Sequence, residues 1–173
     1  MSTVIDFYSG TVTDHRGRSI QDLQTQTFDQ LEANHDYIQW LFPLPEVSKF
    51  NSPAPTLIAD DITAFQSSVT LRQTLNTSFV VMLHFYGLEM TALANTVAIK
   101  RGETWSDRSA NWLTPHNHNY LRISRILRCL VLLGCEDRSH AFLVCLEHLY
   151  ETNRRVIGDV TVRYWRNAIR VKG

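Results

Sequence analysis

Residues 31–43 read LEANHDYIQWLFP, and this stretch does most to predict the fold of the chain. Polar and apolar residues recur in it at the three- and four-residue spacing of an α-helix. A helix would place Glu32, His35, Asp36 and Gln39 on one polar side and would direct Leu31, Ile38, Leu41 and Phe42 elsewhere, toward a core. Trp40 would anchor that core, and Pro43 ends the helical pattern because proline lacks a backbone N–H. We therefore predict helical structure through residues 28–42.

Helical spacing recurs on both sides of this stretch, separated from it on one side by a proline-rich loop over residues 43–61. Capping residues mark the ends of the predicted helices, namely Ser19 with Asp22, Asp60 or Asp61, Ser67 or Ser68, Gly87 and Gly134. Later helices are expected near residues 117–133, 142–149 and 162–169. No strand alternation of useful length is found. The prediction is an all-α fold, a single compact domain over residues 1–173 with five or more helices and long irregular connections.

Four motifs in a fixed order resemble the conserved domain of the opioid growth factor receptor family. They are LEANHDYIQWLFP, APTL at 54–57, MLHFYGLE at 82–89 and HNYLRISRIL at 118–127. The resemblance covers roughly residues 5–149, and several ordered motifs are more specific than one. It implies a receptor-like binding function, because animal members of the family are described as binding an opioid peptide and acting on growth from the nucleus. Because the chain stops soon after this domain, without a repeat-bearing tail, we expect binding rather than receptor signalling.

Composition indicates an ordinary globular protein, with 44% hydrophobic and 20% charged residues. The longest apolar runs, residues 79–83 and 142–146, are far shorter than the roughly 20 residues that span a membrane. The N-terminus lacks the basic and apolar regions of a secretory signal. The three cysteines have no metal-like spacing and are expected to be buried thiols in a reducing compartment. These features predict a soluble, cytoplasmic protein without a transmembrane segment and without a cofactor.

Charge is divided unevenly along the chain. Residues 1–99 carry four basic and ten acidic side chains, and residues 100–173 carry thirteen basic and seven acidic ones. Fourteen of the seventeen cations are arginines, whose planar groups favour defined contacts with carboxylate or phosphate. A basic half is typical of some nucleic-acid-binding proteins, but the pI near 7.1 and the lack of a recognised nucleic-acid-binding motif argue against nucleic acid as a partner.

The start of the helix near residue 117 is the candidate site. His118, Arg122 and Arg125 fall on one helical face there, with Asn119 beside them, at a helix end that is already electropositive. A negative partner should compensate these cations. It is either an internal acid, Asp36 or Glu32 on the polar side of the first motif, or a bound anion. Under the second alternative the ligand site comprises His35, Asp36, Gln39, His118, Asn119, Arg122 and Arg125.

The sequence supports other chemistries less well than this site. His116 and His118 diverge at a helix start and lack further ligands, so no metal is predicted, and lone histidines such as His84 do not predict a haem. Trp105 and Trp112, in a segment read as irregular, are the aromatic residues most expected to line a pocket. The preferred function is binding of an anionic small molecule or peptide. The alternatives are an enzyme that uses His118 as acid or base with Arg122 and Arg125 as an anion clamp, or a structural interaction module. The oligomeric state is not predicted.

Overall fold

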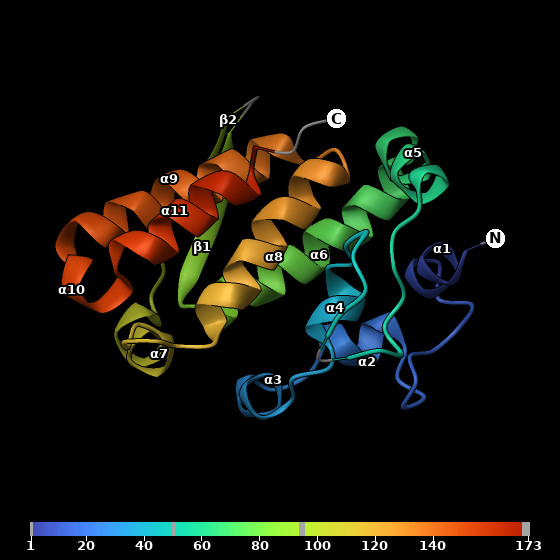
Figure 1. The fold of residues 1–173 in the computed structure, drawn as a ribbon, viewed down its shortest axis with the longest axis horizontal. Helices are drawn as coiled ribbons and strands as arrows, with labels where there is room; N and C mark the ends of the chain where they lie inside the picture. The colour runs from blue at the N-terminus through green and yellow to red at the C-terminus, as the bar shows by residue number, and fades with distance from the viewer. Residues whose placement is uncertain (1, 50, 94–95, 171–173) are drawn as a thin grey trace. The chain divides into compact units, whose positions relative to one another are not determined.

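The computed structural model describes residues 2–49, 51–93 and 96–170. The chain divides into two compact units, Met1–Val81 and Met82–Gly173. Eleven helices and one two-stranded sheet lie in the described residues, and Figure 1 labels them in chain order. The single domain predicted from the sequence stays a prediction.

The first unit is built from short helices and ends within a long one. The helices are α1 (Thr3–Tyr8), α2 (Ile20–Gln24), α3 (Phe28–Ala33), α4 (Ile38–Leu41), α5 (Ala59–Ser67) and α6 (Val69–Phe85), whose last turn belongs to the second unit. The predicted cap of α2 is confirmed, since Ser19 Oγ accepts from the Asp22 N–H at 3.1 Å and Asp22 Oδ2 accepts from the Ser19 N–H at 2.8 Å. Ser68 caps α6 through its side chain alone, with Oγ accepting from the Leu71 N–H at 3.3 Å.

The continuous helix predicted through residues 28–42 is wrong. α3 ends at Ala33, and Asn34 takes the extended angles φ −92° and ψ 134° before α4 begins. Asp36 lies in this break, where its carboxylate contacts arginine side chains of the preceding loop and its carbonyl accepts from Asn51 Nδ2 at 2.7 Å. These long-range contacts outweigh the local helical pattern. The four polar residues of the motif therefore do not share one side of a helix.

Aromatic rings form the core of the first unit. Trp40, on α4, is only 4% exposed, which confirms the anchor expected from the sequence. Its ring centroid lies 4.9 Å from that of Phe7 on α1 and 6.2 Å from that of His15. Tyr8 packs edge-on against Phe65 of α5 at 4.8 Å. These contacts join elements that are distant in sequence into one packed core.

The second unit packs helices beside a hairpin. Its elements are β1 (Leu88–Leu93), β2 (Thr96–Arg101), α7 (Trp105–Trp112), α8 (Asn119–Leu132), α9 (Glu136–Thr152), α10 (Arg154–Ile157) and α11 (Asp159–Ala168). Helices α8, α9 and α11 pack against one another, and β2 packs against α9 (Figure 1). Gly87 and Gly134 follow α6 and α8 with φ of +75° and +79°, as their predicted role at helix ends requires.

The hairpin corrects the all-α prediction. β1 and β2 pair antiparallel, with Leu88 opposite Arg101 and Leu93 opposite Thr96. Val97 and Ile99 are half-buried between exposed neighbours, so the alternation of a strand is present but very short. The sequence between the strands contains no glycine, the residue that most often signals a tight hairpin turn. The fold is predominantly helical with a small sheet.

The segment with two tryptophans is also more regular than predicted. Trp105 and Trp112 are the first and last residues of α7. Trp112 is 1% exposed and donates its indole N–H to the Tyr86 carbonyl at 3.0 Å, so it is part of the core and not of an open pocket wall. Trp105 is half-buried, and the Arg101 guanidinium lies 4.9 Å from its ring centroid.

Candidate functional site

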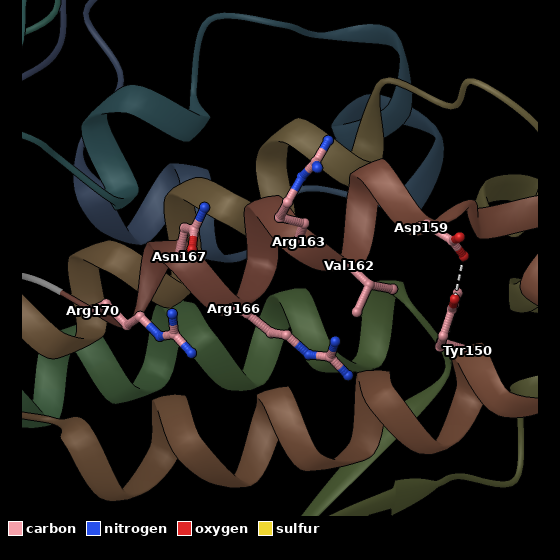
Figure 2. A pocket seen from close by; sticks show the side chains of 7 residues that line it. All are labelled: Tyr150, Asp159, Val162, Arg163, Arg166, Asn167 and Arg170. Carbon is pink, nitrogen blue, oxygen red and sulfur yellow. Dashed lines mark hydrogen bonds between the residues drawn. The ribbon is translucent and has the colours of Figure 1, made fainter.

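The last helix, α11, carries buried apolar side chains and exposed cationic side chains on adjacent parts of its surface. Val162 and Trp165 are buried against the rest of the second unit, as predicted from their spacing. Arg163, Arg166 and Arg170 follow one another at intervals of three and four residues and are all exposed. Arg163 and Arg166 are neighbours on the surface of α11, and Arg170 follows just past its last residue. In Figure 2, Arg166 and Arg170 extend to one side of the helix and Arg163 extends to the other.

These arginines border a surface hollow of about 420 Å³, which Figure 2 shows from close by. The hollow is formed by α11 and the end of α9. Its lining consists of Tyr150, Asp159, Val162, Arg163, Arg166, Asn167 and Arg170. Apart from one valine, every lining side chain can donate or accept a hydrogen bond. The hollow is therefore suited to a polar or charged ligand.

Two carboxylates moderate the positive charge of the hollow. Arg166 Nε lies 2.5 Å from Glu147 Oε1 on α9, and the two side chains are 51% and 35% exposed. An ion pair with this exposure is solvated and weak, so Arg166 can exchange Glu147 for another anion. At the other end, the Tyr150 hydroxyl donates to Asp159 Oδ1 (Figure 2). This hydrogen bond raises the pKa of Tyr150 and keeps its hydroxyl protonated.

The arrangement supports recognition of anions. Arg163 lies on α11, and Arg170 follows two residues after the last residue of that helix. Each presents a planar fork that can hold a carboxylate or phosphate with two parallel hydrogen bonds. Asn167, between them in sequence, adds an amide that can donate or accept. The three arginines outnumber the two nearby carboxylates, so the local charge of the hollow is positive.

The residues predicted as a site at the start of α8 are brought together only in part. Asn119 is fully buried, and its backbone and side-chain N–H groups both donate to Asn117 Oδ1, at 2.9 and 3.0 Å. Arg122 is 5% exposed and donates from Nη1 to Asn119 Oδ1 at 3.1 Å. His118 is exposed, and its Nε2 lies 3.4 Å from Asn119 Nδ2. Arg125 is half-buried one turn further along. Arg122 thus lies within the helix packing and is not presented to solvent as a clamp.

The predicted residues of the first motif lie in the other unit. His35 is exposed, whereas Gln39 is buried, with its Oε1 3.4 Å from Asn51 Nδ2. Asp36 pairs with cations of its own unit: Arg16 Nε lies 2.6 Å and Arg18 Nη2 3.1 Å from its two oxygens. An internal partner for Asp36 therefore exists that the sequence reasoning did not consider. The proposed joining of Asp36 with the start of α8 stays a prediction.

Around Asp36 the loop over residues 14–18 forms an ion-pair network. The Asp14 side chain has no exposed surface, and Arg18 lies 2.6 Å from it. Burial by itself would raise the pKa of Asp14, but the Arg18 side chain and the backbone N–H groups of Arg18 and Arg16 donate to its carboxylate, and the net effect lowers that pKa. For Arg18, burial opposes the charged form, but hydrogen bonds to Asp14 and Asp36 raise its pKa. This network holds the loop against the motif.

Sequence reasoning missed the arginines of α11. The signal was the RxxRxxxR spacing of Arg163, Arg166 and Arg170 beside the apolar face that it did identify. Exposed arginines on an amphipathic helix are common, so this spacing alone does not distinguish a site from an ordinary solvated face. The contribution of α9, through Glu147 and Tyr150, becomes visible only in the tertiary structure.

The described part of the chain contains no candidate metal cluster and no candidate membrane span. No group of three or more histidine, cysteine, aspartate or glutamate side chains there could hold a metal ion. Cys129, Cys135 and Cys145 are all buried free thiols. Burial raises the pKa of the Cys145 thiol to about 11 and also raises that of Cys129. None of the helices described is both long enough and apolar enough to cross a bilayer.

Comparison with known proteins gives a consistent family. The model of the opioid growth factor receptor (OGFr) conserved region matches residues 2–173. The chain is 44% identical over 109 residues to the opioid growth factor receptor of Mus musculus, which covers 63% of this chain and 17% of that protein. It is 38% identical over 136 residues to the receptor of Rattus norvegicus, in an alignment that covers 76% of this chain and 23% of the receptor. It is 38% identical over 110 residues to opioid growth factor receptor-like protein 1 of Mus musculus, in an alignment that covers 64% of this chain and 23% of that protein. The chain thus spans less than a quarter of the length of these relatives. No solved structure matches.

Proposed function

Because the chain belongs to the family defined by the opioid growth factor receptor conserved region, we propose that it is a helical ligand-binding module for an anionic small molecule or peptide. The hollow bordered by Arg163, Arg166 and Arg170 is the observation that carries this proposal. The name of the longer relatives describes them as receptors, which supports a role in recognition.

The binding step follows from the charges of the hollow. Arg163 and Arg170 offer exposed guanidinium groups to the first carboxylate or phosphate that arrives. Arg166 joins them by exchanging its solvated contact with Glu147 for the ligand. Asn167 completes the set with an amide.

The two alternatives receive less support. An enzyme with His118 as acid or base requires Arg122 as part of an anion clamp, yet Arg122 is 5% exposed and is bonded to Asn119. A structural module agrees with the ion-pair network around Asp36, but that network lies in the first unit and does not account for the exposed arginines of α11. We therefore keep anion recognition as the proposed activity.

The test is an anion-dependent change in melting temperature at constant ionic strength, with phosphate, sulfate and citrate as probes against chloride. Binding to the folded state raises the melting temperature by mass action. The wild type should show a saturable rise, and an Arg163→Gln/Arg170→Gln variant should lose it. Lys100→Gln with Arg155→Gln removes the same charge from exposed positions on β2 and α10 that do not line the hollow, and should keep the rise. Equal loss in both double variants would reduce the effect to general electrostatics and contradict the site.

We also infer a cytoplasmic location. The three cysteines are free thiols, which suits a reducing compartment. Microscopy of the tagged full-length protein in its own cells tests this directly.

A further inference from the structure

An apolar strip runs beside the arginines of α11 and is not explained by binding of a small anion. Val160 and Tyr164 are 55% and 63% exposed. They are four residues apart and therefore neighbours on the helix surface. With about 100° of rotation per residue, both fall next to the arginine face, on the side where Asn167 lies. The exposed surface of α11 is thus cationic along one edge and apolar along the other.

We propose that this face of α11 docks an acidic peptide segment that also carries apolar side chains. Carboxylates of the segment would bind Arg163, Arg166 and Arg170, while its apolar side chains would cover Val160 and Tyr164. The proposal rests on the anion-binding function proposed above and specifies the class of ligand. A free phosphate or other small anion needs only the arginines and leaves the apolar strip in water.

Charge complementarity favours a peptide as the occupant. The second unit contains thirteen basic and eight acidic residues, a net charge of +5, which attracts acidic partners. A cationic face flanked by exposed apolar side chains matches an amphipathic acidic segment on both counts. Arg163 and Arg166 are separated by a rise of about 4.5 Å along α11, close to one turn of a bound helix, and Arg170 follows just past the end of α11.

Charge pattern argues against nucleic acid at the same surface. Asp159 lines the hollow, and Glu147 contacts Arg166 at its edge. A single strand carries a phosphate at every nucleotide, so some phosphates would face these carboxylates. A peptide with spaced carboxylates can place neutral residues opposite them. Glu147 also competes with the ligand for Arg166, so its removal should strengthen docking.

The experiment measures fluorescence anisotropy of labelled peptides with the full chain. One peptide is helical, with glutamates at positions i, i+3 and i+7 and leucines along the adjacent edge. A matched peptide replaces the leucines by serine, and a third replaces the glutamates by glutamine. A single-stranded oligonucleotide of equal charge is the fourth probe. We expect the first peptide to bind about tenfold more tightly than the serine peptide, since covering two exposed side chains contributes on the order of that factor.

Protein variants assign the effect to the two edges. Val160→Ser/Tyr164→Ser should abolish the tenfold preference while keeping the phosphate-dependent rise in melting temperature. Glu147→Gln should tighten binding of the acidic peptides about two- to fivefold, the range expected for removing one exposed competing charge. Arg163→Gln/Arg170→Gln should lose both peptide binding and the phosphate response.

The outcomes separate the two proposals. Equal binding of the leucine and serine peptides, or an unchanged preference in Val160→Ser/Tyr164→Ser, overturns the peptide proposal and leaves anion binding standing. Tighter binding of the oligonucleotide than of any peptide overturns it in favour of nucleic acid. If the wild type shows neither a phosphate response nor peptide binding, the anion-binding function itself is wrong.

Discussion

Replacing Trp40 by alanine and by phenylalanine separates the packing of its ring from the burial of its indole N–H. Trp40 is 4% exposed, and Nε1 has no hydrogen-bond partner among the described residues. Alanine removes about 200 Å² of buried ring, equivalent to about 5 kcal/mol at about 25 cal/mol per Å². Partial collapse around the ring of Phe7 reduces this, so we expect Trp40→Ala to lower the free energy of unfolding by about 3–5 kcal/mol.

Phenylalanine should behave differently, because two effects oppose each other. The smaller ring gives up packing worth about 1–2 kcal/mol. It also removes a buried N–H whose lack of a partner costs about 1–3 kcal/mol. We therefore expect Trp40→Phe to unfold within about 1 kcal/mol of the wild type, although alanine at the same position is severely destabilising.

Urea unfolding followed by far-ultraviolet circular dichroism measures both variants, with the dependence on urea concentration compared to confirm two-state behaviour. A Trp40→Ala loss below about 1 kcal/mol would mean that the ring does not anchor the core. A Trp40→Phe loss of about 3 kcal/mol would mean that the indole N–H is satisfied in solution and contributes to stability. Either result would refute the reasoning.

Three further changes test other parts of the structure. The lowered pKa of Asp14 stabilises the fold at pH values above the ordinary aspartate pKa of about 3.9, and this contribution is lost as pH falls through the lower folded-state pKa. Urea unfolding at a series of pH values should therefore show Asp14→Asn to be less stable than the wild type at neutral pH. Below about pH 4, the stability of the variant should change less with pH than that of the wild type. Gly87→Ala places a Cβ 2.9 Å from the Trp105 Cα at positive φ, whereas Gly17→Ala meets no atom within 4 Å at similar φ. Thermal melting should show Gly87→Ala to be more destabilising by about 2 kcal/mol or more. The Cys145 thiol, with its pKa raised to about 11, should react with a thiol reagent at neutral pH far more slowly than after denaturation.

Local capping chemistry and apolar spacing could be predicted because they depend on neighbours in sequence. Ser19, Ser68, Gly87 and the buried face of α11 follow rules that act within one or two turns. The break at Asn34 could not be predicted in this way. It depends on contacts of Asp36 with a loop some twenty residues earlier and with Asn51, and such contacts leave no local pattern.

The hairpin was missed for a different reason. Each strand is six residues long, and only Val97 and Ile99 show half-buried alternation in β2. An alternation of only two half-buried residues in a strand is too short to be distinguished from chance in the sequence. The stability of the hairpin comes from packing of β2 against α9, which is a tertiary contact.

The same argument explains why the sequence pointed to Arg122, which is buried, and not to the exposed arginines near the end of the chain. Sequence reasoning selected Arg122 because a cation is unfavourable near the start of a helix. In the structure, however, the buried Asn119 side chain accepts a hydrogen bond from the Arg122 guanidinium and so supplies part of its hydrogen bonding. Exposure decides whether a cation is available to a ligand, and exposure follows from packing. The zero net charge of the chain hides this, because the first unit has four basic and nine acidic residues and the second has thirteen and eight. With screening over about 8 Å at physiological salt, an incoming anion responds to the local charge around α11 and not to the total.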